Sequence, residues 1–123
     1  MLLEPTPPRI SALLHELGID AKQVTIARKS ALKLNDTLPT IWLVGTVDQI
    51  VLCCTHRTRG LWRRLSRAEI NAARSEGTAT GHVALRLILN GDQDDIVIPL
   101  PPRSSLSEAK LIAAALPTTS SES

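Results

Sequence analysis

The side chains that most often catalyse reactions or bind metal ions are few in this chain and widely spaced. His15, His56 and His82 fall in different predicted elements, and the sequence contains neither an H-E-x-x-H nor a C-x-x-C arrangement. Cys53 and Cys54 are adjacent in a predicted strand, where neighbouring side chains point to opposite faces, so we expect two thiols rather than a disulfide. We therefore expect no catalytic residue, no metal site and no cofactor.

An acidic run, Asp92, Asp94 and Asp95, begins like a calcium-binding loop. Such a loop needs glycine at its sixth position and glutamate at its twelfth, which here are Val97 and Arg103. We interpret the run as the polar tip of a hairpin. The six glycines are scattered, so no phosphate-binding loop is predicted, and we interpret the chain as a non-enzymatic protein.

The segment 56–67 is strongly basic and contains one tryptophan. Arginine binds phosphate and carboxylate groups through two parallel hydrogen bonds, so an acidic protein, an anionic lipid head group or a nucleic acid could bind here. A solvated loop paired with the aspartates of 92–95 is the alternative. A helix-turn-helix alignment over 69–88 places Glu76 and Arg86 at buried positions, so nucleic acid is not favoured. The candidate partner-binding residues are Arg57, Arg59, Trp62, Arg63, Arg64 and Arg67.

The composition predicts an ordinary globular protein with a core of Leu, Ile, Val and Ala. The chain has 123 residues, 43% of them hydrophobic, with two Trp, no Phe or Tyr, and a formal net charge of +2. No apolar run is long enough to span a bilayer, and the first residues lack the pattern of a signal peptide. Together with the two thiols, this favours a cytoplasmic location.

The elements that must position these residues begin with a helix from Pro7 to Leu17, ended by Gly18. One or two strands are predicted within 22–34, and the segments 41–47 and 50–55 predict a hairpin. Ser66 and Glu69 then form the S-x-x-E pattern of a capping box, flanked by Leu65 and Ile70 at the spacing of a hydrophobic staple, which predicts a helix over 67–75.

The remaining elements are a hairpin and a last helix. Alternation predicts strands over 82–89 and 96–100, joined by a turn at Asn90 and Gly91. A second capping box begins a helix over 105–116. The expected fold is one α+β domain, residues 1–117, with helices packed on an antiparallel sheet in the order α-β-β-β-α-β-β-α, followed by a disordered polar tail, 118–123.

This order resembles the class I type III secretion chaperones, small bacterial proteins similar to the Tir chaperone. The similarity is best over 66–116, notably in the segments 72–77, 80–87 and 96–100, and extends to 13–18. The resemblance implies a homodimer that holds an extended effector segment by apolar patches and strand addition. It places the dimer contact on the helix over 67–75, with Ile70, Ala73 and Arg74 as candidate contacts.

The hairpin 83–100 followed by a helix is also similar to the bacterial pleckstrin-homology-like fold, in which strands precede one C-terminal helix. That resemblance implies a strand over 61–70, against which the capping box argues. It also implies that the arginines of 57–67 form a site for a lipid or a protein partner.

Overall fold

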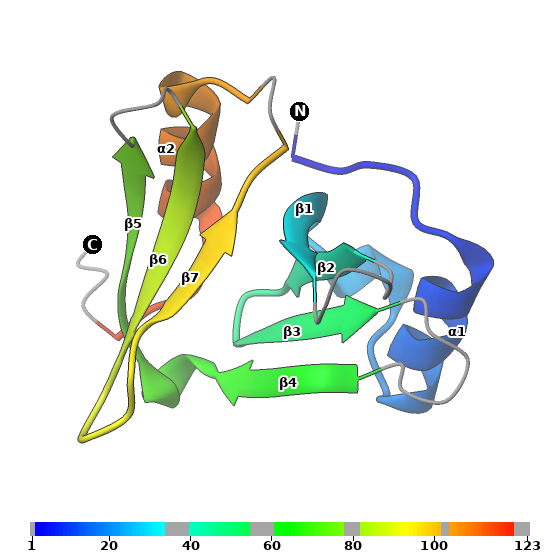
Figure 1. Cartoon of the computed structure of the whole chain (residues 1–123). Coiled ribbons are helices and arrows are strands. Elements are labelled where there is room, and N and C mark those ends of the chain that lie inside the picture. The colour runs from blue at the N-terminus through cyan, green and yellow to red at the C-terminus, as the bar shows by residue number, and fades with distance from the viewer. Residues whose placement is uncertain (1, 34–39, 55–60, 78–81, 102–103, 120–123) are drawn as a thin grey trace.

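The computed structural model describes residues 2–33, 40–54, 61–77, 82–101 and 104–119, and it confirms the α+β class (Figure 1). The described residues form two α-helices, α1 (Pro8–Glu16) and α2 (Leu106–Ala115), and two single 3-10 turns, η1 (Ala21–Gln23) and η2 (Arg67–Glu69). They also form seven strands: β1 (Ile26–Lys33), β2 (Thr40–Gly45), β3 (Gln49–Cys54), β4 (Leu61–Ser66), β5 (Ile70–Gly77), β6 (Val83–Leu89) and β7 (Ile96–Pro99). The order of elements matches the expected one approximately. None of the described helices is long and apolar enough to cross a membrane.

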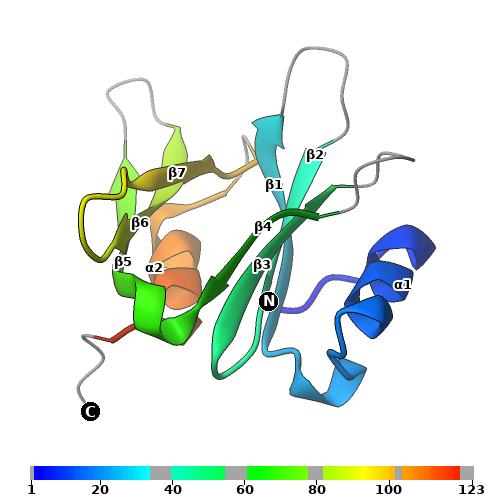
Figure 2. The ribbon, with the colours of Figure 1, turned by 90° about the horizontal axis from the view of Figure 1, so that it is seen from below.

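The strands form two antiparallel sheets rather than the single sheet that was expected. Sheet A is four-stranded, in the order β1-β2-β3-β4, and sheet B is three-stranded, in the order β5-β6-β7. One hydrophobic core joins the two sheets and α2. It contains buried side chains from every strand and from α2, among them Leu43, Leu85 and Ile112. Figure 2 shows α2 beside sheet B and α1 on the far side of sheet A.

Helix α1 covers the face of sheet A that the main core leaves open. Ile10 and Leu14 of α1 pack with Trp42, Val44 and Cys53 in a second cluster of buried residues. The helix ends as predicted, because Gly18 adopts a φ of +79°, which favours glycine. The predicted hairpins are also confirmed, with β2 paired to β3 and β6 paired to β7.

The helix expected over 67–75 is wrong, although the capping box that predicted it is present. A carboxylate oxygen of Glu69 accepts hydrogen bonds from the backbone N–H (2.8 Å) and hydroxyl (3.1 Å) of Ser66, and these bonds lower the pKa of the Glu69 carboxyl. The box stabilises only the single turn η2. From Ile70 the chain continues as β5, which pairs with β6 along its length.

Tertiary packing explains why the strand forms there. Ile70 is fully buried in the main core, and Ala73 packs against that core beneath α2. Two of the β5 side chains beside α2, Ala73 and Ser75, are small, so the strand lacks the bulky alternation that predicts strands from sequence. The pairing with β6 outweighs the helical preference of alanine, arginine and glutamate. Residues 61–66, expected to be a basic loop, form the strand β4.

The two ends of the described chain are held against the sheets. The N-terminal segment, residues 2–6, runs beside β1: the N–H of Ala27 donates to the carbonyl of Leu2 at 2.9 Å, and the N–H of Glu4 donates to the carbonyl of Ala27 at 2.8 Å. At the other end, the N–H of Thr119 donates to the carbonyl of Ile70 at 2.8 Å. These contacts extend two residues past the domain end expected at 117, and residues 120–123 lie outside the described residues.

Candidate functional site

The predicted arginine patch is only partly described, and its described members do not share one surface. Each of three arginines donates to a neutral oxygen of a different neighbouring segment. The pairs are Arg63 Nη2 with Gln93 Oε1 at 2.9 Å, Arg64 Nε with Gln49 Oε1 at 2.6 Å, and Arg67 Nε with the Thr118 carbonyl at 3.1 Å. Arg57 and Arg59 lie outside the described residues, and Trp62 is placed in β4 by its backbone alone.

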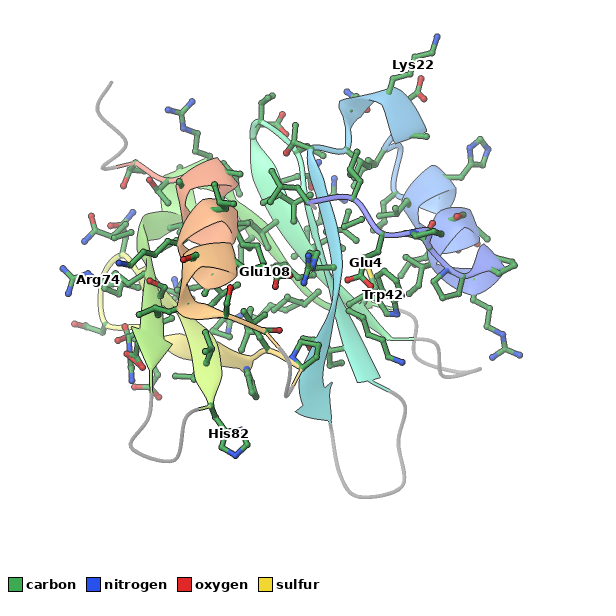
Figure 3. All side chains as sticks on the ribbon, turned by 90° about the horizontal axis from the view of Figure 1, so that it is seen from above. Glu4, Lys22, Trp42, Arg74, His82 and Glu108 are labelled. Carbon is green, nitrogen blue, oxygen red and sulfur yellow. The ribbon has the colours of Figure 1, made fainter. Side chains whose placement is uncertain are left out.

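The candidate dimer contacts are divided between the inside and the outside of sheet B. Ile70 is fully buried, and Ala73 is half-buried beneath α2. Arg74 is exposed and points away from the body of the chain (Figure 3). The three residues therefore do not present the common helical face that was expected of them.

Ala73 and Arg74 nevertheless lie in a groove between the edge of sheet B and α2. The groove has a volume of about 420 Å³. Its lining residues come from the middle of β5 and from the second half of α2: Ala73, Arg74, Ser75, Lys110, Ala113 and Ala114. Four of these six side chains are alanine or serine, so small side chains form most of the lining.

The edge of β5 offers hydrogen-bonding groups to this groove. Among the described residues β5 pairs with β6 alone, and the bonds from Thr119 are confined to the carbonyl of Ile70 at the start of the strand. Alternate residues of an edge strand direct their N–H and C=O groups away from the sheet. The middle of β5 is therefore a place where a further strand can pair.

Helix α2 forms the opposite wall with one continuous stripe of side chains. Leu106, Lys110 and Ala113 follow one another at i, i+4 and i+7, which places them on one side of the helix. Leu106 is 42% exposed, which is a large exposed fraction for an apolar side chain. It lies at the start of the helix, beyond the groove, on the same side as Lys110. The wall thus combines apolar surface with one ammonium group.

The groove carries a net positive charge. Arg74 and Lys110 line it, and no ion pair is formed by either within the described part of the chain. The nearest carboxylate along β5, Glu76, is bound to Arg86, and this pairing lowers the pKa of the Glu76 carboxyl and raises that of the Arg86 guanidinium. Asp95 binds the same guanidinium at 3.2 Å. The groove cations therefore remain available to an external acidic group.

No family model, curated protein or solved structure matches this chain. Within the described residues, no three His, Cys, Asp or Glu side chains lie together as metal ligands would. Its function must therefore be inferred from its own geometry. The β5–α2 groove combines the backbone hydrogen-bonding groups of a strand edge with two cations, Arg74 and Lys110, that form no ion pair among the described residues.

The sequence predicted a role for only two of the six residues that line this groove, Ala73 and Arg74. Lys110, Ala113 and Ala114 were assigned to the last helix without any role, although an exposed helix side made of alanine beside an exposed leucine is an available signal. Ala73 and Arg74 were singled out because of a helix that does not exist. The sequence could not indicate that β5 and α2 lie side by side.

Proposed function

We propose that the chain is a non-enzymatic, pleckstrin-homology-like module that binds an extended acidic segment of another protein in the β5–α2 groove. Two observations favour this over the chaperone resemblance. The pleckstrin-homology-like resemblance requires a strand over 61–70, of which 61–66 is a strand and 67–69 is the turn η2, and two antiparallel sheets are followed by one C-terminal helix. The helix on which the chaperone resemblance placed its dimer contact is the strand β5.

The observation that carries the proposal is the edge of β5 beside α2, which beyond Ile70 is not paired with any other strand of the described residues. An extended peptide that pairs with such an edge gains main-chain hydrogen bonds, while its alternate side chains contact the neighbouring surfaces. Here one side of the added strand faces small apolar side chains of α2, Ala113 and Ala114. Small residues at that place leave room for the branched or aliphatic side chains of the partner.

The charges define the class of segment. A strand laid between Arg74 and Lys110 has two cations within reach of its exposed side chains. Carboxylate or phosphate groups on the partner would be attracted, whereas a basic segment would be repelled. In a segment in which acidic and aliphatic residues alternate, the aliphatic side chains can contact the alanines of α2 and the acidic side chains can pair with Arg74 and Lys110.

The proposal is tested with a fluorescein-labelled peptide of alternating glutamate and valine, titrated in fluorescence anisotropy. Reversal of both charges by Arg74→Glu with Lys110→Glu is expected to weaken binding by about tenfold, because each partly exposed ion pair contributes about 0.5–1 kcal/mol. The matched control is Lys22→Glu with Lys29→Glu, which changes the net charge equally at exposed residues outside the groove. A peptide of alternating lysine and valine should not bind.

Two outcomes would contradict the proposal. If the control pair weakens binding as much as the groove pair, the attraction is a general effect of net charge. If Arg63→Glu with Arg64→Glu weakens binding while the groove variants do not, the partner binds along β4 instead. If a second copy of this chain occupied the groove instead, light scattering would detect a dimer that Ala113→Trp dissociates.

A further inference from the structure

A second hollow lies on the opposite side of sheet A, far from the groove. It has a volume of about 770 Å³, is open to solvent on one side, and is lined by the N-terminal segment, α1, η1 and the start of β1. Seven of its thirteen lining residues are apolar: Leu3, Pro5, Leu14, Ile19, Ala21, Val24 and Ala27. A cavity with this volume and lining is typical of sites for small organic molecules.

The walls of this cavity are held by hydrogen bonds rather than by loose loops. The N-terminal segment is bound to Ala27, as described above. Asp20 caps the start of η1 by accepting a hydrogen bond from the N–H of Lys22 at 3.2 Å. Its own N–H donates to Gln23 Oε1 at 2.8 Å. The cavity is therefore formed before any ligand enters.

The charge of the lining selects one class of ligand. The ionisable lining residues are Glu4, His15 and Asp20, and the lining contains neither lysine nor arginine. Thr6 and Ser11 also line it, and their hydroxyl oxygens are bonded to each other at 2.7 Å. Glu4 is bound to the buried Arg28 at 3.1 Å, so Asp20 is the lining carboxylate whose charge is not balanced by an ion pair among the described residues. A carboxylate beside an apolar cavity attracts a cation and repels an anion.

We propose that this cavity binds a small amphiphilic amine. Its apolar body would lie against Leu14, Ile19 and Val24, and its ammonium group would lie near the carboxylate of Asp20. The site is separate from the β5–α2 groove, with sheet A between α1 and α2 (Figure 2). The proposal therefore does not depend on the proposed function.

Three probes of equal chain length separate charge from apolar fit: octylammonium, octanol and octanoate. Each is titrated into the full chain by NMR, with the amides of Leu14, Ile19 and Ala27 as reporters. Octylammonium is expected to saturate these shifts and to bind about fivefold more tightly than octanoate, because the exposed charge of Asp20 attracts the ammonium and repels the carboxylate of octanoate. Octanol should lie between the two.

Two variants locate the site. Ala21→Trp places a large side chain at an exposed position that lines the cavity and should abolish the saturable shifts. Lys22→Trp is the matched control, since Lys22 does not line the cavity and points away from the body of the chain (Figure 3). Asp20→Asn removes one charge but retains the capping oxygen, so it should reduce octylammonium affinity toward that of octanol without unfolding the turn.

Each outcome of these titrations either supports or overturns the proposed amine site. Preference for octylammonium that is lost in Asp20→Asn and Ala21→Trp, but not in Lys22→Trp, supports the proposal. Equal affinity for octanoate and octylammonium overturns the assignment of an amine. Absence of saturable shifts with every probe, or binding retained in Ala21→Trp, overturns the site. Ala113→Trp should change none of these results.

Discussion

Replacement of Arg28 by alanine is expected to lower the free energy of unfolding by about 2–3 kcal/mol. Arg28 is only 8% exposed, and its guanidinium binds two carboxylates from the two ends of the chain. Its Nε lies 3.1 Å from Glu4 of the N-terminal segment, and its Nη2 donates to Glu108 in the first turn of α2. Figure 3 shows Glu4 and Glu108 on the two sides of β1.

The magnitude follows from what alanine would leave behind. The cation is buried, and its removal leaves two carboxylates without their cation and a vacated volume beside β1, although Glu4 still accepts the N–H of Lys29 at 2.9 Å. Breaking a fully buried pair costs about 3–5 kcal/mol, but the side chains of Glu4 and Glu108 are 34% and 30% exposed, so water would offset part of the cost. The expected loss therefore lies below that range.

Urea unfolding of Arg28→Ala measures this loss, and Arg64→Ala is the matched control. Arg64 is exposed on β4 with one bond to Gln49, so its replacement should change stability by less than about 0.5 kcal/mol. A double-mutant cycle with Glu108→Gln isolates the contact with α2. If Arg28→Ala is as stable as Arg64→Ala, the arginine does not join the two ends of the fold.

Replacement of Ile70 by alanine is expected to cost about 3 kcal/mol of stability, because a fully buried isoleucine is truncated in a packed core. Ile70 stands where the chain leaves η2 and enters β5, and it packs with Leu65 in the main core. Ile88 of β6 is the control, since it is half-exposed between the buried Leu87 and Leu89 and so faces outward from sheet B.

The truncation Ile88→Ala should cost about 1 kcal/mol or less, because water already reaches this side chain. Both variants are compared by urea unfolding, and the dependence of the free energy of unfolding on urea concentration is compared as well. A change in that slope would reveal a change in the unfolded state. Equal losses for the two variants would contradict the assignment of Ile70 to the inner face at the start of β5.

Local signals in the sequence predicted those elements whose ends or alternation are encoded nearby. Gly18 ended α1, the turn at Asn90 and Gly91 joined β6 to β7, and Ser105 capped α2 by accepting the N–H of Glu108 at 3.1 Å. Each of these signals depends on residues within four positions, and no distant segment competes with them.

The errors arose where distant segments decide the structure. The capping box of Ser66 and Glu69 formed as predicted, yet pairing with β6 converted the following residues to a strand. Inner positions of β5 are small because α2 covers them, so their pattern resembles a helix. The groove and the amphiphile cavity both lie between segments far apart in the chain, which no spacing rule in one sequence can bring together.

The central claim is that an added strand pairs with the edge of β5, and N-methylation of the probe peptide tests it most directly. Two versions of the alternating glutamate–valine peptide carry methyl groups on the amides of all valines or of all glutamates. In a paired strand, neighbouring N–H groups point to opposite edges, so only one of the two sets faces β5.

Anisotropy titration of the two peptides should therefore give unequal affinities. One methylated peptide is expected to bind as tightly as the parent, and the other to lose binding by at least about tenfold, since several main-chain hydrogen bonds of about 0.5–1.5 kcal/mol each are removed. Equal affinities of the two methylated peptides, whether both retained or both lost, would contradict strand addition at β5.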